Sequence, residues 1–373
     1  MWSVFAAEYL NTSPNDAVNT PLLGGDLMKH LSFNKQAEDH QLTWRTANRV
    51  ELGNNGTQNG KTREHILPSD KWLLGVWEEI QDQLVRYIEA DQIQPHAGKH
   101  NLKSSWTQCA NTFFPFRLNP NMKSMLVSFL NRDLALNVSS IDNIDLEYAA
   151  PGKLSPRYLL GEQGGMRGSG QTSPDVAIQF SCEDGKCGIY LIENKYTENS
   201  YSSCSAAKKT IDSAHSLQGL QANPDPDRCM YAARLINDPE NQCHQVSWGR
   251  KYWTRLAKHI NIPAFCNLPY CPAMNDGYQM FRQQALAQGI ADARLFDHII
   301  SGVAYDERNT ELITCLNSIG ISDFRKEWAD LFNIDSEVIF HCFSHQHLVS
   351  WVTRSRSSYI RSWGSYLNTR YGF

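Results

Sequence analysis

Three charged residues lie at the open end of a predicted β-hairpin. Residues 172–198 read TSPDVAIQFSCEDGKCGIYLIENKYTE, in which two apolar runs flank the Asp-Gly turn signal at residues 184–185. Asp175 opens the first run, and Glu193 and Lys195 close the second. Two carboxylates and an amine at one end of a hairpin indicate either a divalent-cation site or a structural ion pair.

The length of the turn decides which residues of the hairpin face each other. A two-residue turn would place Asp175 opposite Asn194, whereas a three-residue loop would place Asp175 opposite Glu193, with Gly185 in the left-handed position that such loops favour. The Cβ atoms of directly opposed residues lie about 4.5–5.5 Å apart. Two anions at that spacing raise the pKa of one of them or hold a cation between them. Oxygen ligands suit Mg²⁺ or Mn²⁺ better than zinc.

The two faces of the hairpin predict a sheet that is covered on both sides. In the three-residue register, one face is wholly apolar, and the other is small or apolar along most of its length. A second packed layer is therefore expected beyond the second face. The first face holds Val176, Ile178, Phe180, Tyr190 and Ile192, and the second holds Ala177, Gln179, Ile189 and Leu191.

Helical and strand patterns alternate along the rest of the chain. This interleaving predicts an α/β or α+β fold with helices on both faces of the sheet. Residues 1 to about 65 are weakly patterned. The periodicity predicts helices over residues 70–90, 104–116, 121–136, 248–260 and 276–293, and strands over residues 144–149 and 296–304.

Composition sets the broad class of the protein. The chain has 373 residues, 41% of them hydrophobic, and a formal net charge of −4. It is therefore globular and has no basic field over the whole molecule, so a nucleic acid would have to meet local basic patches. We find no signal peptide and no apolar run of membrane-spanning length, and we expect a cytoplasmic protein with reduced cysteines.

The charged end of the hairpin resembles the signature of the PD-(D/E)xK nuclease superfamily. Pro174-Asp175 and, on the next strand, Glu193-Asn194-Lys195 match that signature, and the runs SPDVAI and IENKYTE resemble a bacterial family of restriction endonucleases within the superfamily. The resemblance implies a restriction-endonuclease-like α/β core, a mixed sheet flanked by helices, with N-terminal helical and C-terminal extensions. It divides the chain into an accessory region (1–103), a nuclease core (104–305) and a basic-aromatic region (306–373).

The resemblance also implies a reaction and its residues. Asp175 and Glu193, with the carbonyl oxygen of Asn194, would bind Mg²⁺ or Mn²⁺, and Lys195 would assist the cleavage of a DNA phosphodiester. Many members carry a further upstream acidic residue, for which Glu147 has a better strand context than Glu162. The alternative is a protein that keeps this fold and binds nucleic acid, or is structural, without cutting. The sequence leaves open whether the protein is a homodimer.

Basic residues outside the signature are candidates for DNA contacts. Arg282 and Gln283 lie on the predicted helix over residues 276–293, and Arg250 and Lys251 lie on the basic-aromatic helix over residues 248–260. The favoured explanation of Arg282 and Gln283 is a solvent-exposed polar face of that helix. No helix-turn-helix or zinc-finger pattern specifies base readout, and no Ser-His-Asp or dinucleotide-binding pattern indicates another enzyme class.

Cysteines concentrate in a predicted insertion over about residues 199–272. Cys204, Cys229, Cys243, Cys266 and Cys271 lie there, and no pair of them has the C-x₂-C spacing typical of a zinc site. A structural zinc or an iron–sulfur centre therefore stays open, beside the simpler interpretation of buried reduced thiols.

Overall fold

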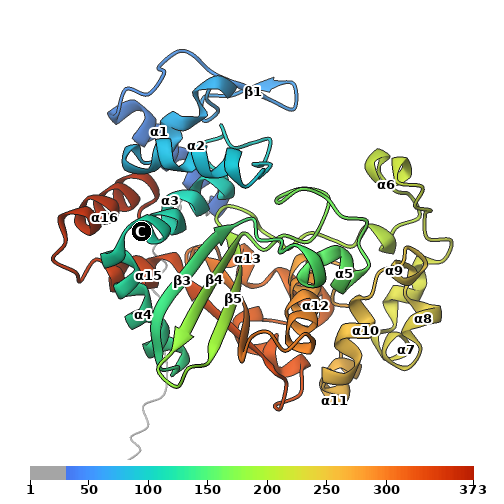
Figure 1. Cartoon of the computed structure of the whole chain (residues 1–373). Helices are drawn as coiled ribbons and strands as arrows, with labels where there is room; N and C mark the ends of the chain where they lie inside the picture. Colours follow the sequence, from blue (N-terminus) through green and yellow to red (C-terminus); the bar gives the residue numbers. More distant parts are fainter. Residues whose placement is uncertain (1–30) are drawn as a thin grey trace, which may run out of the picture. The chain divides into compact units, whose positions relative to one another are not determined.

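The computed structural model describes residues 31–373, and a five-stranded mixed sheet lies at the centre of that part of the chain (Figure 1). The strands lie side by side in chain order. The first three pair antiparallel with one another, and the last two continue parallel to the third. This arrangement confirms the predicted α/β class. The strands are β3 (Val138–Leu146), β4 (Val176–Cys182), β5 (Cys187–Lys195), β6 (His298–Tyr305) and β7 (Val338–Ser344).

The β4–β5 hairpin has the three-residue loop that places Asp175 opposite Glu193. Val176 pairs with Ile192, and the ladder continues to the turn without a shift in register. Gly185 has a φ of +82°, the left-handed conformation that a residue without Cβ adopts easily. The charged residues of the two strands therefore lie together at the open end of the hairpin.

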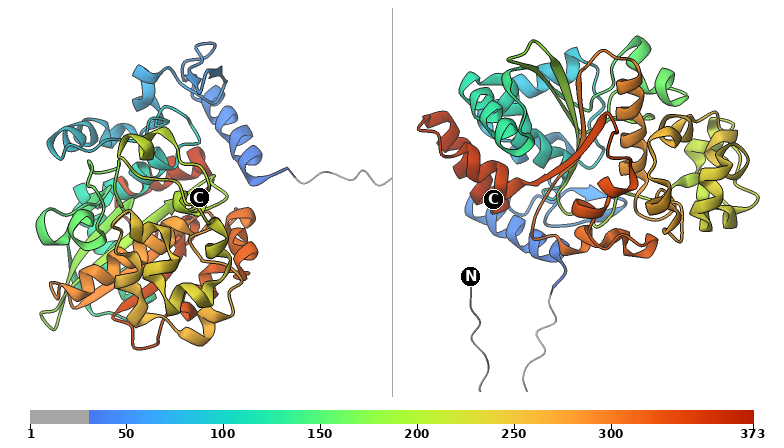
Figure 2. Two further views of the ribbon diagram at one scale, coloured as in Figure 1. Left: turned by 90° about the vertical axis from the view of Figure 1, so that its right-hand side faces the viewer. Right: turned by 90° about the horizontal axis from the view of Figure 1, so that it is seen from below.

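Helices cover one face of the sheet and share a core with the apolar face of the hairpin. This core includes all five residues predicted for that face, from Val176 to Ile192. The right view of Figure 2 looks along the sheet, with α3 and α4 on one side and α12 on the other. The helices on this side are α1 (Phe33–Ala47), α2 (Gln81–Ala90), α3 (Ser105–Leu118), α4 (Pro120–Leu134), α15 (His345–Val352) and α16 (Ser358–Tyr371).

The opposite face packs against a second layer, as the sequence predicts. Ala177, Ile189 and Leu191 belong to a separate core beneath this layer. The helices that contribute buried side chains here are α5 (Pro156–Leu160), α7 (Ala232–Asn237), α10 (Tyr252–Leu256), α11 (Ile262–Cys266), α12 (Tyr278–Asp292), α13 (Thr310–Ile313) and α14 (Phe324–Glu327). The insertion also carries α6 (Ser213–Leu217), α8 (Pro239–Gln242) and α9 (His244–Ser247).

Short elements complete the described chain. A two-stranded hairpin, β1 (Thr57–Gln58) and β2 (Lys61–Thr62), precedes α2. No helix within residues 31–373 is both long and apolar enough to cross a membrane. The 3₁₀ helices are η1 (Ser69–Gly75), η2 (Glu78–Ile80), η3 (Gly152–Leu154), η4 (Ser205–Ala207), η5 (Pro226–Met230), η6 (Ala257–His259), η7 (Cys315–Ile319) and η8 (Ala329–Leu331).

The single helix predicted over residues 70–90 is wrong, because a tertiary contact interrupts it. Two 3₁₀ turns precede α2, and the chain is extended at Val76. The side chain of Asn111 donates to Gly75 O at 3.0 Å and accepts from Trp77 N at 2.8 Å. These backbone groups are therefore bonded outside a helix, which local periodicity does not reveal.

The predicted helix over residues 248–260 is also wrong. Gly249 has a φ of +77° and separates α9 from α10, which begins at Tyr252 and is followed by a 3₁₀ turn. By contrast, α1 lies in the weakly patterned N-terminal segment. Its buried face includes Gln41, whose Nε2 donates to Tyr196 Oη at 3.0 Å and to Arg370 O at 2.8 Å. A polar residue at a core position hides the helical pattern.

The predicted boundaries at residues 103 and 305 fall inside one packed body. Residues 32–373 form a single compact unit. Residues after 305 supply β7 at the edge of the central sheet, and α15 and α16 in the core beside it. The packing therefore does not break at these boundaries, and the functional division of the chain stays a prediction.

Candidate active site

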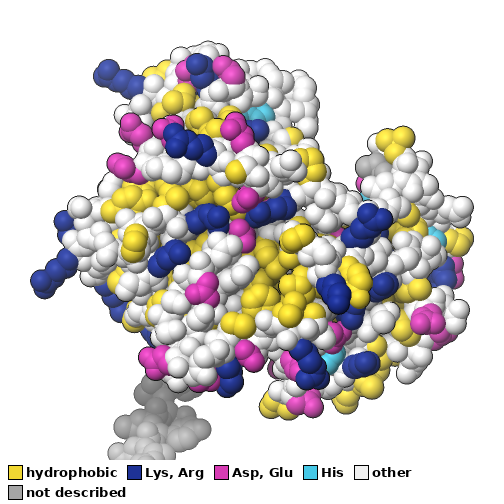
Figure 3. All heavy atoms as spheres, viewed as in Figure 1, with side chains coloured by type: hydrophobic (Ala, Val, Ile, Leu, Met, Phe, Trp, Pro, Cys, Tyr) yellow, Lys and Arg dark blue, Asp and Glu magenta, His cyan; other side chains and the backbone are white. Residues whose placement is uncertain are grey.

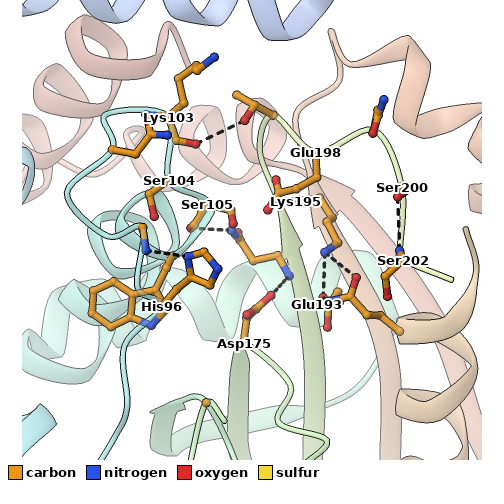
Figure 4. Close-up of a pocket in the computed structure, with 18 of the residues that line it drawn as sticks. His96, Lys103, Ser104, Ser105, Asp175, Glu193, Lys195, Glu198, Ser200 and Ser202 are labelled. Carbon is orange, nitrogen blue, oxygen red and sulfur yellow. Dashed lines mark hydrogen bonds and ion pairs between the residues drawn. The ribbon is translucent and has the colours of Figure 1, made fainter. Parts of the chain in front are cut away.

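Asp175 joins the ends of β3 and β5. It directly precedes β4, and its carbonyl oxygen accepts the backbone N–H of Glu147 at 2.9 Å. Its Oδ2 accepts the backbone N–H of Asn194 at 2.7 Å (Figure 4). The Asn194 side chain points to the other face, where its Nδ2 donates to Gln108 Oε1 at 2.8 Å. The Asp175 carboxylate is thus held against the backbone of the Glu193-Asn194-Lys195 segment.

Glu193 and Lys195 lie on the same face of β5, because side chains alternate along a strand. Both are buried, with 5% and 4% of their surface exposed. Lys195 Nζ lies 3.0 Å from Glu193 Oε1. In Figure 4 both side chains point into the same pocket as Asp175. The structure therefore brings together the three residues of the signature.

Gln279 completes this cluster, and sequence reasoning missed it. Its Nε2 donates to Glu193 Oε1 at 2.6 Å, and its Oε1 accepts from Lys195 Nζ at 3.1 Å. Gln279 lies in the first turn of α12 and one turn before Arg282. Residues three apart share a helix face, so Gln279 lies on the same face as Arg282. The position of Arg282 in the sequence therefore pointed to Gln279 as well.

Glu147 reaches the cluster because the chain turns at this residue. The strand predicted over residues 144–149 ends at Leu146 instead, and it begins earlier, at Val138. Glu147 has a φ of +51°, which breaks the alternation of the strand, so that Leu146 and Tyr148 belong to different cores. Glu147 is 8% exposed and lines the same cavity as Asp175 and Glu193.

The acidic groups of this cluster lack enough neighbouring positive charge. Burial, followed by the charge of Glu193, raises the pKa of Glu147 to about 8. Burial, followed by the charges of Glu193 and Glu147, raises the pKa of Asp175 well above its usual range. Burial alone would lower the pKa of Lys195, but the charges of Glu193, Glu198 and Asp175 outweigh burial and raise it. The site is therefore suited to bind a further cation.

Glu162, the other candidate for the upstream acid, has a structural environment. Its carboxylate accepts hydrogen bonds from Thr172 N at 2.7 Å, Thr172 Oγ1 at 2.5 Å and Tyr252 Oη at 2.8 Å. It is 5% exposed and does not line the cavity that holds Asp175. The geometry therefore favours Glu147 over Glu162.

The two glutamates should respond in opposite ways to loss of charge. In EDTA at pH 7 we expect Glu147→Gln to raise the free energy of unfolding by about 1–3 kcal/mol, because the native state no longer has to bury or protonate a carboxylate. Glu162→Gln should lower the free energy of unfolding by about 1–3 kcal/mol, because an amide replaces one acceptor of a buried donor. Urea unfolding measures both changes.

The effect of Glu147 on stability should also depend on pH. The native state holds the Glu147 proton up to about pH 8, whereas the group's ordinary pKa is 4.5. The free energy of unfolding should therefore fall as the pH rises between these values, and it should fall less steeply in Glu147→Gln. Equal destabilisation by both substitutions would contradict this assignment.

The cavity beside these residues has a volume of about 960 Å³ and a polar lining. This volume lies at the upper end of the range for small-ligand sites, of roughly 300–1,000 Å³. Gln279 and Arg282 come from α12, and Ser104, Ser105 and Trp106 come from the start of α3. The walls are therefore supplied by helices from both faces of the sheet, at the end where Asp175 and Glu193 emerge.

One comparison identifies the family. A family model described as restriction endonuclease associating with ARP matches residues 38–372. The chain belongs to this family of restriction endonucleases. No curated protein and no solved structure matches it. The match covers the sheet, the candidate active site and the insertion, so the resemblance seen in the signature residues extends over almost the whole described chain.

In this member of the family, only one of the four residues predicted to contact nucleic acid lines the cavity. Arg282 does so, and its guanidinium lies over the ring of Tyr278 at 5.4 Å from the centroid. Gln283 is turned toward the sheet, where its Nε2 donates to Gly302 O at 2.9 Å. Adjacent helical residues point in different directions, so Gln283 is turned away from the cavity that Arg282 lines. Its buried position does not support a phosphate contact.

Arg250 and Lys251 lie away from the cavity. Arg250 donates to Gly161 O at 2.9 Å, and the backbone N–H of Lys251 donates to Leu160 O at 2.8 Å, while its side chain is exposed. On the face drawn in Figure 3, basic side chains are interspersed with acidic ones. A DNA contact at these two residues stays a prediction.

The donor set at the hairpin end fits a hard divalent cation. The available groups are the carboxylates of Asp175 and Glu193 and the carbonyl oxygen of Asn194, all of them oxygen donors. No group of three or more His, Cys, Asp or Glu side chains in residues 31–373 forms a ready-made ligand set. Mg²⁺ usually takes one or two carboxylates and keeps several waters, so it does not need such a set.

Proposed function

We propose that this chain is a Mg²⁺- or Mn²⁺-dependent endonuclease that hydrolyses phosphodiester bonds of DNA. One observation carries the proposal: Asp175, Glu193 and Lys195 converge at the end of the β4–β5 hairpin, beside an open cavity of about 960 Å³. Membership of a restriction-endonuclease family supports DNA as the substrate.

Asp175, Glu193 and the carbonyl oxygen of Asn194 would hold the ion. When bound, Mg²⁺ supplies Lewis acidity toward a phosphate oxygen and lowers the pKa of a coordinated water. The raised pKa of Asp175 is consistent with this assignment, because a nearby divalent cation favours the ionised carboxylate.

The chain's own residues would orient the substrate and stabilise charge. Lys195 carries a buried ammonium group. This group would hold the attacking water or stabilise the negative charge that develops on the phosphate oxygens. Gln279 is a positioning residue, because it bonds to both Glu193 and Lys195. Arg282 supplies a positive charge on the cavity wall for a neighbouring phosphate.

Incubation of purified protein with supercoiled and linear DNA tests the proposal. Nicked or linear product in Mg²⁺ or Mn²⁺, and none in EDTA, is the expected result. The alternative of a non-cleaving nucleic-acid-binding protein predicts a mobility shift without product in every metal. Cutting that persists in EDTA would contradict the proposed dependence on a metal.

Glu193→Gln should weaken metal binding without unfolding the protein. We expect the Kd for Mn²⁺ to rise about 10-fold or more, because an anionic oxygen ligand becomes a neutral amide. The Tm should change little, because the amide still accepts from Lys195 Nζ. Calorimetric titration and a thermal melt measure the two quantities. An unchanged Mn²⁺ affinity would remove Glu193 from the proposed ligand set.

A further inference from the structure

Four cysteines from distant parts of the insertion line one small cavity. Cys204, Cys229, Cys243 and Cys271 surround a space of about 20 Å³ that is enclosed mainly by aromatic and other apolar side chains. All four thiols are free. A negative charge on Cys271 would be felt by each of the other three, so the four cysteines lie near one another. The remaining cysteine of the insertion, Cys266, is exposed and does not line this cavity.

A hydrogen-bond donor points at one sulfur of this cluster. Cys204 Sγ accepts from Gln245 Nε2 at 3.1 Å, in a buried bond. Such a donor stabilises a thiolate, which is the form that binds metals.

A further donor and a backbone bond belong to the same cluster. The indole N–H of Trp253 is buried, has no acceptor at hydrogen-bond distance and lies beside Cys243. The backbone N–H of Cys271 donates to Cys229 O at 2.8 Å, which ties two of the four cysteines together. A buried donor without an acceptor is costly, and a thiolate at Cys243 would supply one.

We propose that Cys204, Cys229, Cys243 and Cys271 bind one structural Zn²⁺ ion. Four thiols match the tetrahedral sulfur coordination that zinc prefers in structural sites. The space between them, about 20 Å³, suits one ion and not an iron–sulfur cluster. The thiols must turn inward and lose protons on binding, because residues 31–373 contain no ready-made set of three ligands.

Neighbouring ligand types do not compete for this site. His244 also lines the cavity, but its Nε2 lies 2.9 Å from Gln221 O and its Nδ1 lies 3.3 Å from Ser247 Oγ. Both ring nitrogens are therefore bonded elsewhere, which leaves the four sulfurs as the ligands. The spacing of these cysteines has no C-x₂-C pair, so a sequence motif does not reveal the site.

The position of the cluster explains why an ion would be useful there. The insertion consists of short helices and turns around a small core, and a metal ion stabilises such a segment directly. It also adjoins the start of α12, since Cys204 N donates to Ala273 O at 2.9 Å and Gln279 N donates to Tyr201 O at 2.9 Å. The ion would thus help to fix the helix that carries Gln279 and Arg282.

Metal analysis of the full-length chain, purified under reducing conditions without chelator, tests the proposal. We expect about one zinc per chain, lost in Cys229→Ser and Cys271→Ser and retained in the matched control Cys266→Ser. Replacement by Co²⁺ should give the visible absorption of a tetrathiolate site. Neither measurement depends on nuclease activity, so this proposal and the proposed function fail independently.

Chemical release of the bound ion gives a second test. If the cysteine variants do not fold, titration of wild-type protein with a mercurial reagent should release one zinc as four thiols react. No bound metal, zinc that is retained in both variants, or iron with visible absorbance in untreated protein would each overturn the proposal.

Discussion

Replacement of Lys195 by methionine is expected to reduce the rate of DNA cleavage by about 10³-fold or more, with the protein still folded. The reason is the removal of a buried positive charge at the centre of the proposed site, where the local dielectric is low. Methionine keeps most of the length of the side chain, so packing is largely preserved. Lys195 is 4% exposed, and its ammonium is bonded to Glu193 and Gln279. Single-turnover cleavage at saturating Mg²⁺ measures the effect.

The matched control uses the other end of the same hairpin. Lys186 lies at the turn with its side chain 52% exposed, and its ammonium pairs with the equally exposed Asp184 at 2.8 Å. Lys186→Met should leave cleavage within about 2-fold of wild type, because an exposed ion pair contributes little. Asp175→Ala should lose cleavage as Lys195→Met does. Full activity in Lys195→Met would exclude Lys195 from the reaction.

Substitution of Gly302 should have the largest effect on stability. Gly302 lies in the interior strand β6, between Ile192 of β5 and His341 of β7. A Cβ atom on Gly302 would lie 1.7 Å from His341 O and 3.0 Å from Tyr190 Cε2. Gly302→Ala should therefore force the two parallel strands apart and lower the free energy of unfolding by about 3 kcal/mol or more. Urea unfolding measures this loss.

Gly185→Ala separates steric clash from the loss of glycine itself. Gly185 has a φ of +82°, but a Cβ atom there would have no neighbour within 4 Å. We expect a loss of about 1–2 kcal/mol, from backbone strain alone. Because Gly302 lies beside Ile192, its substitution should also disturb Glu193 and reduce cleavage, whereas Gly185→Ala should not. Comparable stability of the two variants would contradict the close approach of β6 and β7.

Much of the site was predictable because it depends on short-range patterns. The Asp-Gly turn signal, the apolar alternation and the loop geometry set the register of the hairpin, which brings Asp175 to the same strand end as Glu193 and Lys195. The α/β class with helices on both faces of the sheet followed from local periodicity, whereas the mixed sheet was implied by the family resemblance.

Other features depend on contacts between distant parts of the chain. Asn111 interrupts the predicted helix at Gly75, and Gln41 occupies a core position because Tyr196 and Arg370 bond to it. Local periodicity does not encode such partners. For the same reason the pattern over residues 248–260 did not show that Gly249 ends a helix there.

Asp175, Glu193 and Lys195 are neighbours because they lie on one hairpin, whose register is determined by its own turn and strand residues. Glu147 and Gln279 reach them only through long-range packing: the first by a left-handed turn after β3, the second from the start of α12. The four buried cysteines of the insertion meet in the same way, without motif spacing. Strand pairing across a tight turn depends on local geometry, whereas the approach of separate helices and loops depends on how the whole core packs.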